Sequence, residues 1–430
     1  MVLERGILPK RFSMPLEPSP IAVGPEPGSP ALPPRDRRIA MGVLLAGIVC
    51  VGMGQTVVFS VLPPLGRQIG LADMQVAAIF GLSALFWVLL VPLWGRRSDV
   101  AGRKPLILLG LSGFVLSMVL FASSIGLGLS GALSGIGLYA LILATRSIYG
   151  VIGSATPAAA QAYIADRTPP ELRTAGMSSF SAAFGIGAML GPGVGGAVAV
   201  LGPVAPLYAV AGLAAVMVIA IWLLLPERSN PIPRLARPKL NVGDRRLRPF
   251  LIFGLAFGVI NAVPIQTVAF YFIDVLHLDT KEAPQFVGVG LMGAAMASLF
   301  SQLVLVQRFG LQPRVLLRLA PLAILFGHLL IAVSKDFGPL VFGLMLSGCG
   351  AGMAIPGFTS AASLAVGPDE QGAAAGLSNS AGAFGFVIAP VIGFSLYAVA
   401  PQTPFVLTSA MAALLLIYAW MSPTIRRLGR

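Results

Sequence analysis

The sequence predicts an all-α integral membrane protein of 12 transmembrane helices, arranged as two pseudo-symmetric six-helix bundles. Three observations support this fold class. Only 10% of the 430 residues are charged and 56% are hydrophobic, whereas soluble domains carry roughly 25% charged residues. Long runs without Asp, Glu, Lys or Arg have the length of bilayer-spanning helices. The second half of the chain also repeats features of the first. This composition excludes a soluble enzyme, a nucleic-acid binder and a disordered chain.

Most spans follow directly from a charge-free run, because a membrane-crossing helix needs about 20 mostly apolar residues. Five charge-free runs are long enough for one span each: 39–66, 74–95, 249–273, 283–307 and 337–368. A shorter span, about 315–334, carries Arg318 near its start, where a long side chain can reach the membrane surface.

Three longer runs, 105–145, 174–226 and 371–425, each exceed what one span needs. Each is therefore expected to contain two spans, the second span of the first run continuing past Arg146 to about residue 164. The breaks fall at a Gly/Ser turn near 126–135, at Gly202 and Pro203, and near 400–404.

The two bundles divide the chain into five segments. Residues 1–34 contain nine prolines and no apolar stretch of the kind that a signal peptide needs, which favours a disordered tail. A basic linker separates the two sets of six spans. We expect a disordered cytoplasmic tail at 1–37, an N-terminal bundle at 38–225, a cytoplasmic linker at 226–248, a C-terminal bundle at 249–422 and a cytoplasmic tail at 423–430.

The placement of basic residues predicts the orientation. All Lys and Arg except Arg67, Arg146, Lys281 and Lys335 fall in the two tails and in alternate loops, and cytoplasmic loops carry an excess of these residues. Both termini are therefore expected in the cytoplasm, and the composition is compatible with a bacterial inner membrane. This topology and contact with anionic membrane lipids explain the net charge of +13, so no nucleic-acid partner is expected.

Two segments about 200 residues apart are similar to each other. The sequence 183–185 (Ala-Phe-Gly) precedes Gly191 and Pro192, and the same three residues at 383–385 precede Ala389 and Pro390. Two related six-span halves are typical of transporters whose substrate site lies between the halves, near the bilayer midplane. The alternative is that Gly/Ala-rich helices resemble one another by composition alone.

The segment after the second span carries the most specific motif. Gly95, Asp99, Gly102 and Arg103 stand in the pattern G-x-x-x-D-x-x-G-R-K. Gly95 permits close helix approach, and Gly102 permits a tight turn. The pattern resembles the signature of the major facilitator superfamily.

This resemblance implies a conformational lock. Asp99 is expected at the positive N-terminal end of span 11, and Arg103 is expected to pair with Asp166 at the end of span 4. Asp166 and Arg173 also resemble a superfamily segment between spans 4 and 5. The lock would hold the outward-open state and break on inward opening; a purely structural basic loop is the alternative.

Span 5 carries Gly191, Pro192, Gly195 and Gly196 in the pattern G-x-x-x-G-P-x-x-G-G. The proline bends the helix, and the glycines let another helix pack at backbone distance. The pattern resembles a signature of 12-span drug/proton antiporters, which implies export rather than import. A kinked packing helix without information on direction is the alternative.

Arg146 lies inside span 4, where a charged side chain is costly unless it is paired or faces water. With Tyr149 and Gly150 it resembles the family's R-x-x-Y-G segment, which implies a place in the central cavity and a role in proton coupling. The acid that this antiporter group usually has in span 1 is missing. Asp274, at the outer end of span 7, is the acid closest to a span interior. Arg146 and Asp274 are therefore the candidates for proton coupling.

Polar and aromatic residues of spans 1, 4, 7 and 11 are expected to bind the substrate, because the resemblance implies that these spans line the cavity. A cavity with an arginine and no carboxylate disfavours organic cations, so we expect a neutral, zwitterionic or anionic amphiphile. About half of the candidates are expected to bond neighbouring helices instead. They are Gln55, Thr56, Phe59, Arg146, Tyr149, Asn261, Gln266, Phe270, Tyr271 and Asn379.

Together these features predict a secondary active transporter that exports small amphiphilic, drug-like compounds in exchange for protons by alternating access. Two alternatives stay open: export of an endogenous metabolite or a metal-chelating small molecule, and a non-transporting sensor or scaffold of the same fold. The expected partners are the substrate, protons and membrane lipids, and the protein is expected to be a monomer. No metal site is expected, because the two Cys and two His residues form no ligand pattern. No enzyme activity or cofactor is expected, because the sequence has no phosphate-binding glycine loop with an adjacent lysine and no nucleophile–base pair.

Overall fold

The computed structural model describes residues 34–167, 173–227, 240–241, 243–367 and 370–428; within these ranges, the side chains of 34–37, 173–178, 372–373, 375 and 379 are not described. Every secondary-structure element of the described residues is a helix. Twelve helical stretches are long and apolar enough to cross a membrane. The prediction of 12 spans in an all-α fold is confirmed.

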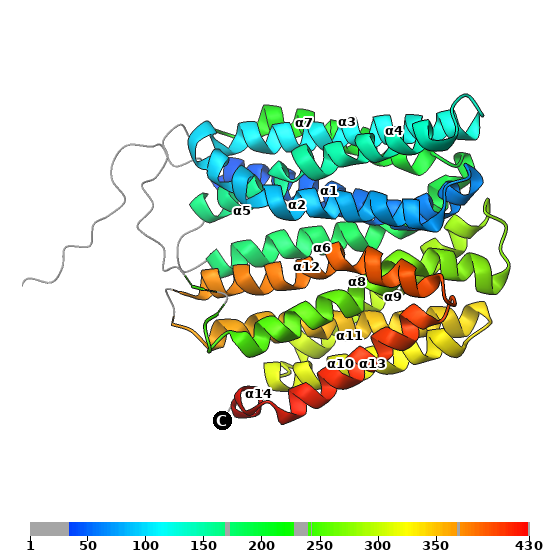
Figure 1. Ribbon diagram of the computed structural model, residues 1–430. Coiled ribbons are helices and arrows are strands. Elements are labelled where there is room, and N and C mark those ends of the chain that lie inside the picture. Colours follow the sequence, from blue (N-terminus) through cyan, green and yellow to red (C-terminus); the bar gives the residue numbers. More distant parts are fainter. Residues whose placement is uncertain (1–33, 168–172, 228–239, 242, 368–369, 429–430) are drawn as a thin grey trace, which may run out of the picture.

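The first six spans lie together on one side of the molecule (Figure 1). The fourth span is composite, because a π-helical segment lies between its two α-helical parts. The elements are α1 (Pro34–Gln68), α2 (Asp73–Ala101), α3 (Arg103–Leu129), α4 (Gly135–Ile148), the π-helical η1 (Tyr149–Gly153), α5 (Ala155–Arg167), α6 (Arg173–Val198), the short 3-10 helix η3 (Ala199–Leu201) and α7 (Ala205–Leu224).

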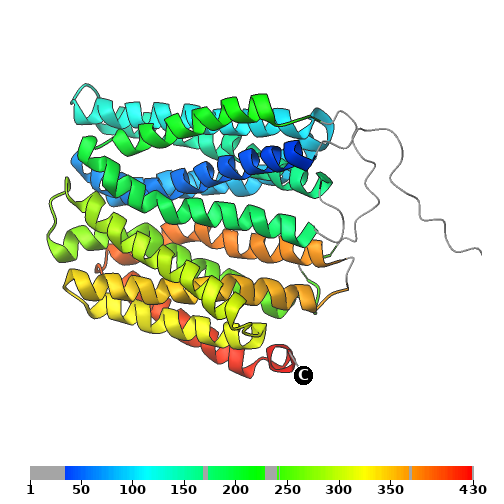
Figure 2. The same ribbon diagram turned by 180° about the vertical axis from the view of Figure 1, so that it is seen from behind.

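The last six spans form the other side, as the view from behind also shows (Figure 2). We call the end at which α1 begins the terminal end, and the opposite end the far end. The elements are α8 (Arg248–Leu276), α9 (Ala283–Phe300), the π-helical η4 (Ser301–Arg308), α10 (Pro313–Val333), α11 (Phe337–Leu364), α12 (Gln371–Tyr397), α13 (Thr403–Met421) and the short α14 (Pro423–Arg427).

The connection between α2 and α3 is shorter than the charged sequence suggests. Helix α2 continues through the motif to Ala101, and Gly102 alone separates it from α3. Gly102 has φ +92°, which a glycine adopts at little cost, so the predicted tight turn is present. An ion pair of 2.5 Å between Asp99 and Arg103, one helical turn apart, spans this turn.

The repeated segments lie on equivalent helices, α6 and α12, and each packs against the first helix of its own half. A Cβ atom at Gly187 of α6 would overlap the carbonyl oxygen of Val49 in α1. In the second half, a Cβ atom at Gly385 of α12 would overlap the backbone of Gly258 in α8. Both helix pairs therefore approach at backbone distance, as small residues allow in membranes.

The two halves touch closely near the far end. Pro192 and Gly196 of α6 lie against Gly288 of α9, where a Cβ atom would be 2.6 Å from the Pro192 carbonyl oxygen. Towards the terminal end, a Cβ atom at Gly95 or Gly376 would meet no atom of the described residues within 4 Å. The close helix approach expected at Gly95 stays a prediction.

A charged network joins the halves at the far end. Arg67 of α1 donates to Asp73 of α2 at 2.7 Å and to Asp274 of α8 at 3.0 Å, with a second, shorter bond to Asp274. The hydroxyl of Tyr397, at the end of α12, donates to Asp274 at 2.5 Å. We call Arg67, Asp73, Asp274 and Tyr397 the far-end network. Its ionic side chains are only 23–31% exposed, so solvent screens them less than a surface pair.

Replacing Gly187 by Val should destabilise the fold, because the new side chain must displace the α1 backbone. The matched control is Gly185→Val, one half-turn away on α6, where a Cβ atom meets nothing within 4 Å. We expect a clearly lower melting temperature for Gly187→Val and a near-native one for Gly185→Val, measured by size-exclusion chromatography after heating. Equal melting temperatures would contradict the packing described.

Replacing Arg67 by Ala should loosen the far end. Met292 of α9 packs against Gly193 of α6 there, so a single cysteine introduced as Met292→Cys, with Cys50 and Cys349 replaced by Ser, reports the opening. Maleimide labelling should become severalfold faster in Arg67→Ala. Lys281→Ala is the charge control, since Lys281 is exposed and forms no ion pair with another described residue. Unchanged labelling in Arg67→Ala would show that the network does not hold the halves together.

Candidate substrate site

Arg146 is buried in the last turn of α4, with 2% of its surface exposed. Its guanidinium carbon lies 4.5 Å from the ring centre of Tyr149 and 5.8 Å from that of Phe121. Nε and Nη1 are buried and have no hydrogen-bond partner in the described part of the chain. Cation–π contacts compensate part of the desolvation cost, but the two N–H donors are still unsatisfied.

A π-helical segment, η1, starts three residues after Arg146. Trp94 of α2 donates to the carbonyl oxygen of Val151 at 2.7 Å, which satisfies a backbone group inside the widened turn. Gly150 lies so close to α2 that a Cβ atom would be 2.6 Å from the Ser83 carbonyl oxygen. Segments of this kind occur frequently at functional sites. Here η1 holds the Tyr149 ring beside the arginine.

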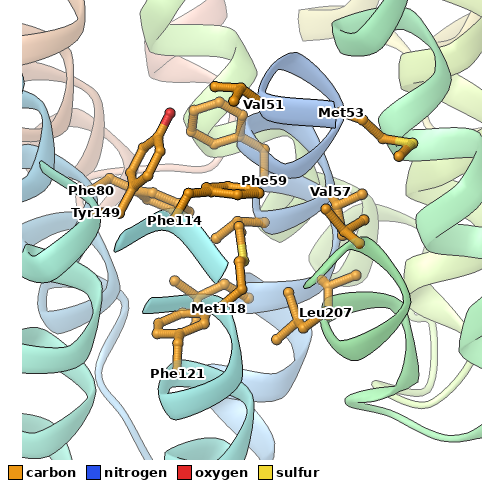
Figure 3. Close-up of a cluster of buried hydrophobic side chains, with 14 of the residues drawn as sticks. Val51, Met53, Val57, Phe59, Phe80, Phe114, Met118, Phe121, Tyr149 and Leu207 are labelled. Atoms are coloured by element: carbon orange, nitrogen blue, oxygen red, sulfur yellow. The ribbon is translucent and has the colours of Figure 1, made fainter. Parts of the chain in front are cut away.

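Aromatic rings form an apolar wall beside Arg146. Tyr149 lies 5.1 Å from Trp87 and 5.4 Å from Phe114 between ring centres, and Phe59 lies 5.0 Å from Phe80. Figure 3 shows Phe59, Phe80, Phe114 and Tyr149 gathered beside α1. Small-molecule sites typically combine such apolar walls with a few polar groups.

Two glutamines supply further unpaired polar atoms. The Oε1 atoms of Gln55 on α1 and Gln266 on α8 are buried and accept no hydrogen bond from a described residue. Buried acceptors without partners are costly, so these atoms favour a ligand or water that donates to them. Asn261 of α8 is half-buried, and its side chain forms no hydrogen bond with another described residue.

Other predicted substrate residues bond within their own half. The hydroxyl of Thr56 donates to the Gly52 and Met53 carbonyl oxygens of its own helix. Tyr271 is fully buried and donates to the Ile331 carbonyl of α10 at 2.9 Å. Phe270 lies under the Arg67 guanidinium at 5.0 Å and therefore belongs beside the far-end network. The Asn379 side chain lies outside the described residues.

The span 5 motif faces two neighbours. Gly191 and Gly195 lie against α1, next to Thr56 and Ser60, whereas Pro192 and Gly196 lie against α9 of the other half. Through this motif, α6 contacts α1 within its own half and α9 of the other half.

The predicted lock residues lie at the terminal end. Arg103 donates to Asp166 at 2.9 Å, which is the pair that the resemblance implied, and to Ser98 at 2.5 Å. Arg103 and Asp166 both belong to the first half, so this pair does not itself join the two halves. The expected contact of Asp99 with the start of span 11 involves α12 residues whose side chains are outside the described set, as is the side chain of Arg173.

Sequence reasoning missed how the start of the central linker binds this motif. The carboxylate of Glu227 accepts hydrogen bonds from the backbone N–H groups of Arg103 and Lys104, and burial raises the pKa of Glu227. Lys104 donates to the Trp222 carbonyl at 2.7 Å, and Arg167 to the Pro226 carbonyl at 2.7 Å. The sequence signal for this contact was Glu227, the acidic residue directly after the apolar run that ends at residue 226.

Sequence reasoning also missed most of the far-end network. Asp274 was a candidate for proton coupling, but Arg67 and Tyr397 were not connected with it, since they lie 207 and 123 residues away. Within the described residues, no group of three or more His, Cys, Asp or Glu is placed to hold a metal ion.

Known proteins resemble the chain along most of its length. It is 25% identical to Multidrug resistance protein 1 of Bacillus subtilis (strain 168), over 90% of this chain and 97% of that protein. It is 27% identical to the class C tetracycline resistance protein of Escherichia coli, over 85% and 91%. The crystal structure of the human organic anion transporter MFSD10 (TETRAN) has the same fold, with a TM-score of 0.65 and 21% identity over 90% of this chain and all of that one.

The sequence pattern of the Major Facilitator Superfamily matches residues 44–390. This match agrees with the 12 spans and with the motifs on α2, α4 and α6. The chain is thus a multi-pass membrane protein and a secondary transporter, not an enzyme, and it belongs to the Major Facilitator Superfamily.

Proposed function

We propose that the protein exports small amphiphilic compounds, anionic or neutral, in exchange for protons by alternating access. The observation that carries this proposal is the buried Arg146, whose Nε and Nη1 have no hydrogen-bond partner among the described residues. A carboxylate or enolate oxygen of a substrate would satisfy these donors with charge-assisted hydrogen bonds. Aromatic walls beside the arginine suit the apolar part of an amphiphile.

The charge balance of the spans favours the same class of substrate. All 16 Asp and Glu residues of the sequence lie outside the interiors of the 12 spans, so an organic cation would find no counter-charge near the midplane. Gln55 and Gln266 offer acceptors to hydroxyl or amide groups. Their positions on α1 and α8, the first spans of the two halves, suit a ligand that contacts both halves.

The relatives support the direction of transport and the type of compound. Two of them are named as multidrug and tetracycline resistance proteins, which suits removal of drug-like compounds from the cell. A structural relative is described as an organic anion transporter, which suits a positively charged site. With the terminal end in the cytoplasm, as the basic loops favour, the close contacts of the far end would seal the external side.

The far-end network offers a route for protons to act. A proton on Asp274 would remove the charge that attracts Arg67 across the boundary, while Arg67 would keep Asp73 as a partner within its own half. Asp274 accepts hydrogen bonds from Arg67 and Tyr397, and Asp73 is the second carboxylate bound to Arg67. Protons from outside would then favour the outward-open state that releases substrate, since a ligand shifts an equilibrium through unequal affinity for two states.

Replacing Arg146 by Ala should abolish the export of anionic compounds. In everted membrane vesicles with an imposed proton gradient, aromatic carboxylates should release protons in the wild type, measured with a pH-sensitive dye. We expect at least about a tenfold loss in Arg146→Ala, because a charged hydrogen bond contributes about 1.5–3 kcal/mol. Uncharged amides of the same compounds should respond less to the mutation.

Arg146→Lys, which keeps the charge, should retain part of the response, and Arg308→Ala is the control for an exposed arginine. If Arg146→Ala responds to every carboxylate as the wild type does, the assignment of Arg146 to the substrate is wrong. A proton response to organic cations alone would contradict the proposed substrate class.

A further inference from the structure

Three arginines gather at the terminal end, away from the candidate substrate site. Arg314 and Arg318 lie one turn apart near the start of α10, and Arg426 lies in α14. Arg314 and Arg426 are both close enough to Arg318 to repel its charge. In the part of the chain that the structure describes, no carboxylate pairs with any of the three. Three like charges held together without a counter-ion indicate a site for an anion.

The cluster lies where the protein surface changes from apolar to charged. The Arg318 guanidinium stacks on the ring of Trp420, near the end of α13, with its carbon 4.0 Å from the ring centre. Trp420 is 56% exposed, and Leu319 and Met421 beside these residues are also exposed. Tryptophan is enriched at the level of lipid headgroups. The anion that this cluster attracts would therefore have apolar surface directly beside it.

Buried contacts fix the cluster in place. Ile425 of α14 is fully buried and packs into the hydrophobic cluster that contains Leu316 and Leu317 of α10. This anchor holds the neighbouring Arg426 near α10. The N–H group of Arg318 at Nε is buried and has no hydrogen-bond partner among the described residues. The positive end of the α10 dipole adds to the same field, because α10 begins at Pro313 without a side-chain cap.

We propose that Arg314, Arg318 and Arg426 bind the phosphate headgroup of an anionic phospholipid, with its acyl chains along the exposed apolar face of α10 and α13. A guanidinium fork matches the geometry of phosphate oxygens. Free phosphate shares this chemistry, but only a lipid would also use Trp420, Leu319 and Met421. The proposal concerns a surface separate from the transport site, so it holds whichever compound the protein transports and in whichever direction.

Native mass spectrometry of the purified protein tests this site. The full chain would be titrated with phosphatidylglycerol, with phosphatidylcholine and with inorganic phosphate. We expect a first phosphatidylglycerol molecule to bind at least about tenfold more tightly in the wild type than in the double variant Arg318→Ala/Arg426→Ala, since each basic residue near an anionic headgroup adds to affinity. Phosphatidylcholine should show no such difference.

The matched control is Arg97→Ala combined with Arg96→Ala, which removes two exposed arginines from the same end and should leave the first binding step unchanged. If the double variant folds poorly, two single variants replace it: Arg426→Ala, which removes a charge, and Arg318→Lys, which retains one. Equal phosphatidylglycerol binding in the cluster and control variants would overturn the proposal. Displacement of the lipid by millimolar inorganic phosphate would also overturn it and assign the cluster to a free anion.

Discussion

Arg67 carries one positive charge that two carboxylates from different halves of the protein share. Asp73 belongs to the same half as Arg67, and Asp274 to the other. Because both partners are charged and partly shielded, the guanidinium holds the far end together without a covalent link. The backbone contacts of α6 with α9 close around the same end. An ionic contact of this kind can break and re-form, as the proposed rocking of the two bundles would require.

The rigidity of each bundle has a different physical basis. Glycines allow α1 to meet α6, and α8 to meet α12, at backbone distance. Such contacts are close-packed and do not depend on charge. The molecule therefore combines close packing within each half with a boundary at which an ion pair accompanies the packing of α6 on α9. Under the proposed alternating access, this boundary is the contact that would have to open.

The sequence predicted what depends on composition and on local spacing. Span length, the breaks at Gly202 and near residue 400, and the turn at Gly102 follow from bilayer thickness and from glycine conformation. The Arg103–Asp166 pair followed from a family motif.

Contacts between distant helix ends could not be predicted, because the periodicity of a sequence does not say which helix ends meet. Arg67 thus looked like one isolated charge, and Tyr271 like a cavity residue although its hydroxyl bonds α10. Nor did the sequence signal the π-helical η1, whose register depends on Trp94 and Ser83 of another span.

The central claim is that the two ends open in opposition, with the Arg67–Asp274 contact as the external latch. Spin labels would report this directly, one pair at Gln68 and Lys335 of the far end and another at Arg97 and Gln312 of the terminal end. Distances would be measured by electron–electron double resonance in the wild type and in Asp274→Asn, which mimics the protonated acid. We expect the far-end distance to lengthen and the terminal-end distance to shorten in the variant. If both distances stay the same, or both lengthen, alternating access through this latch is contradicted.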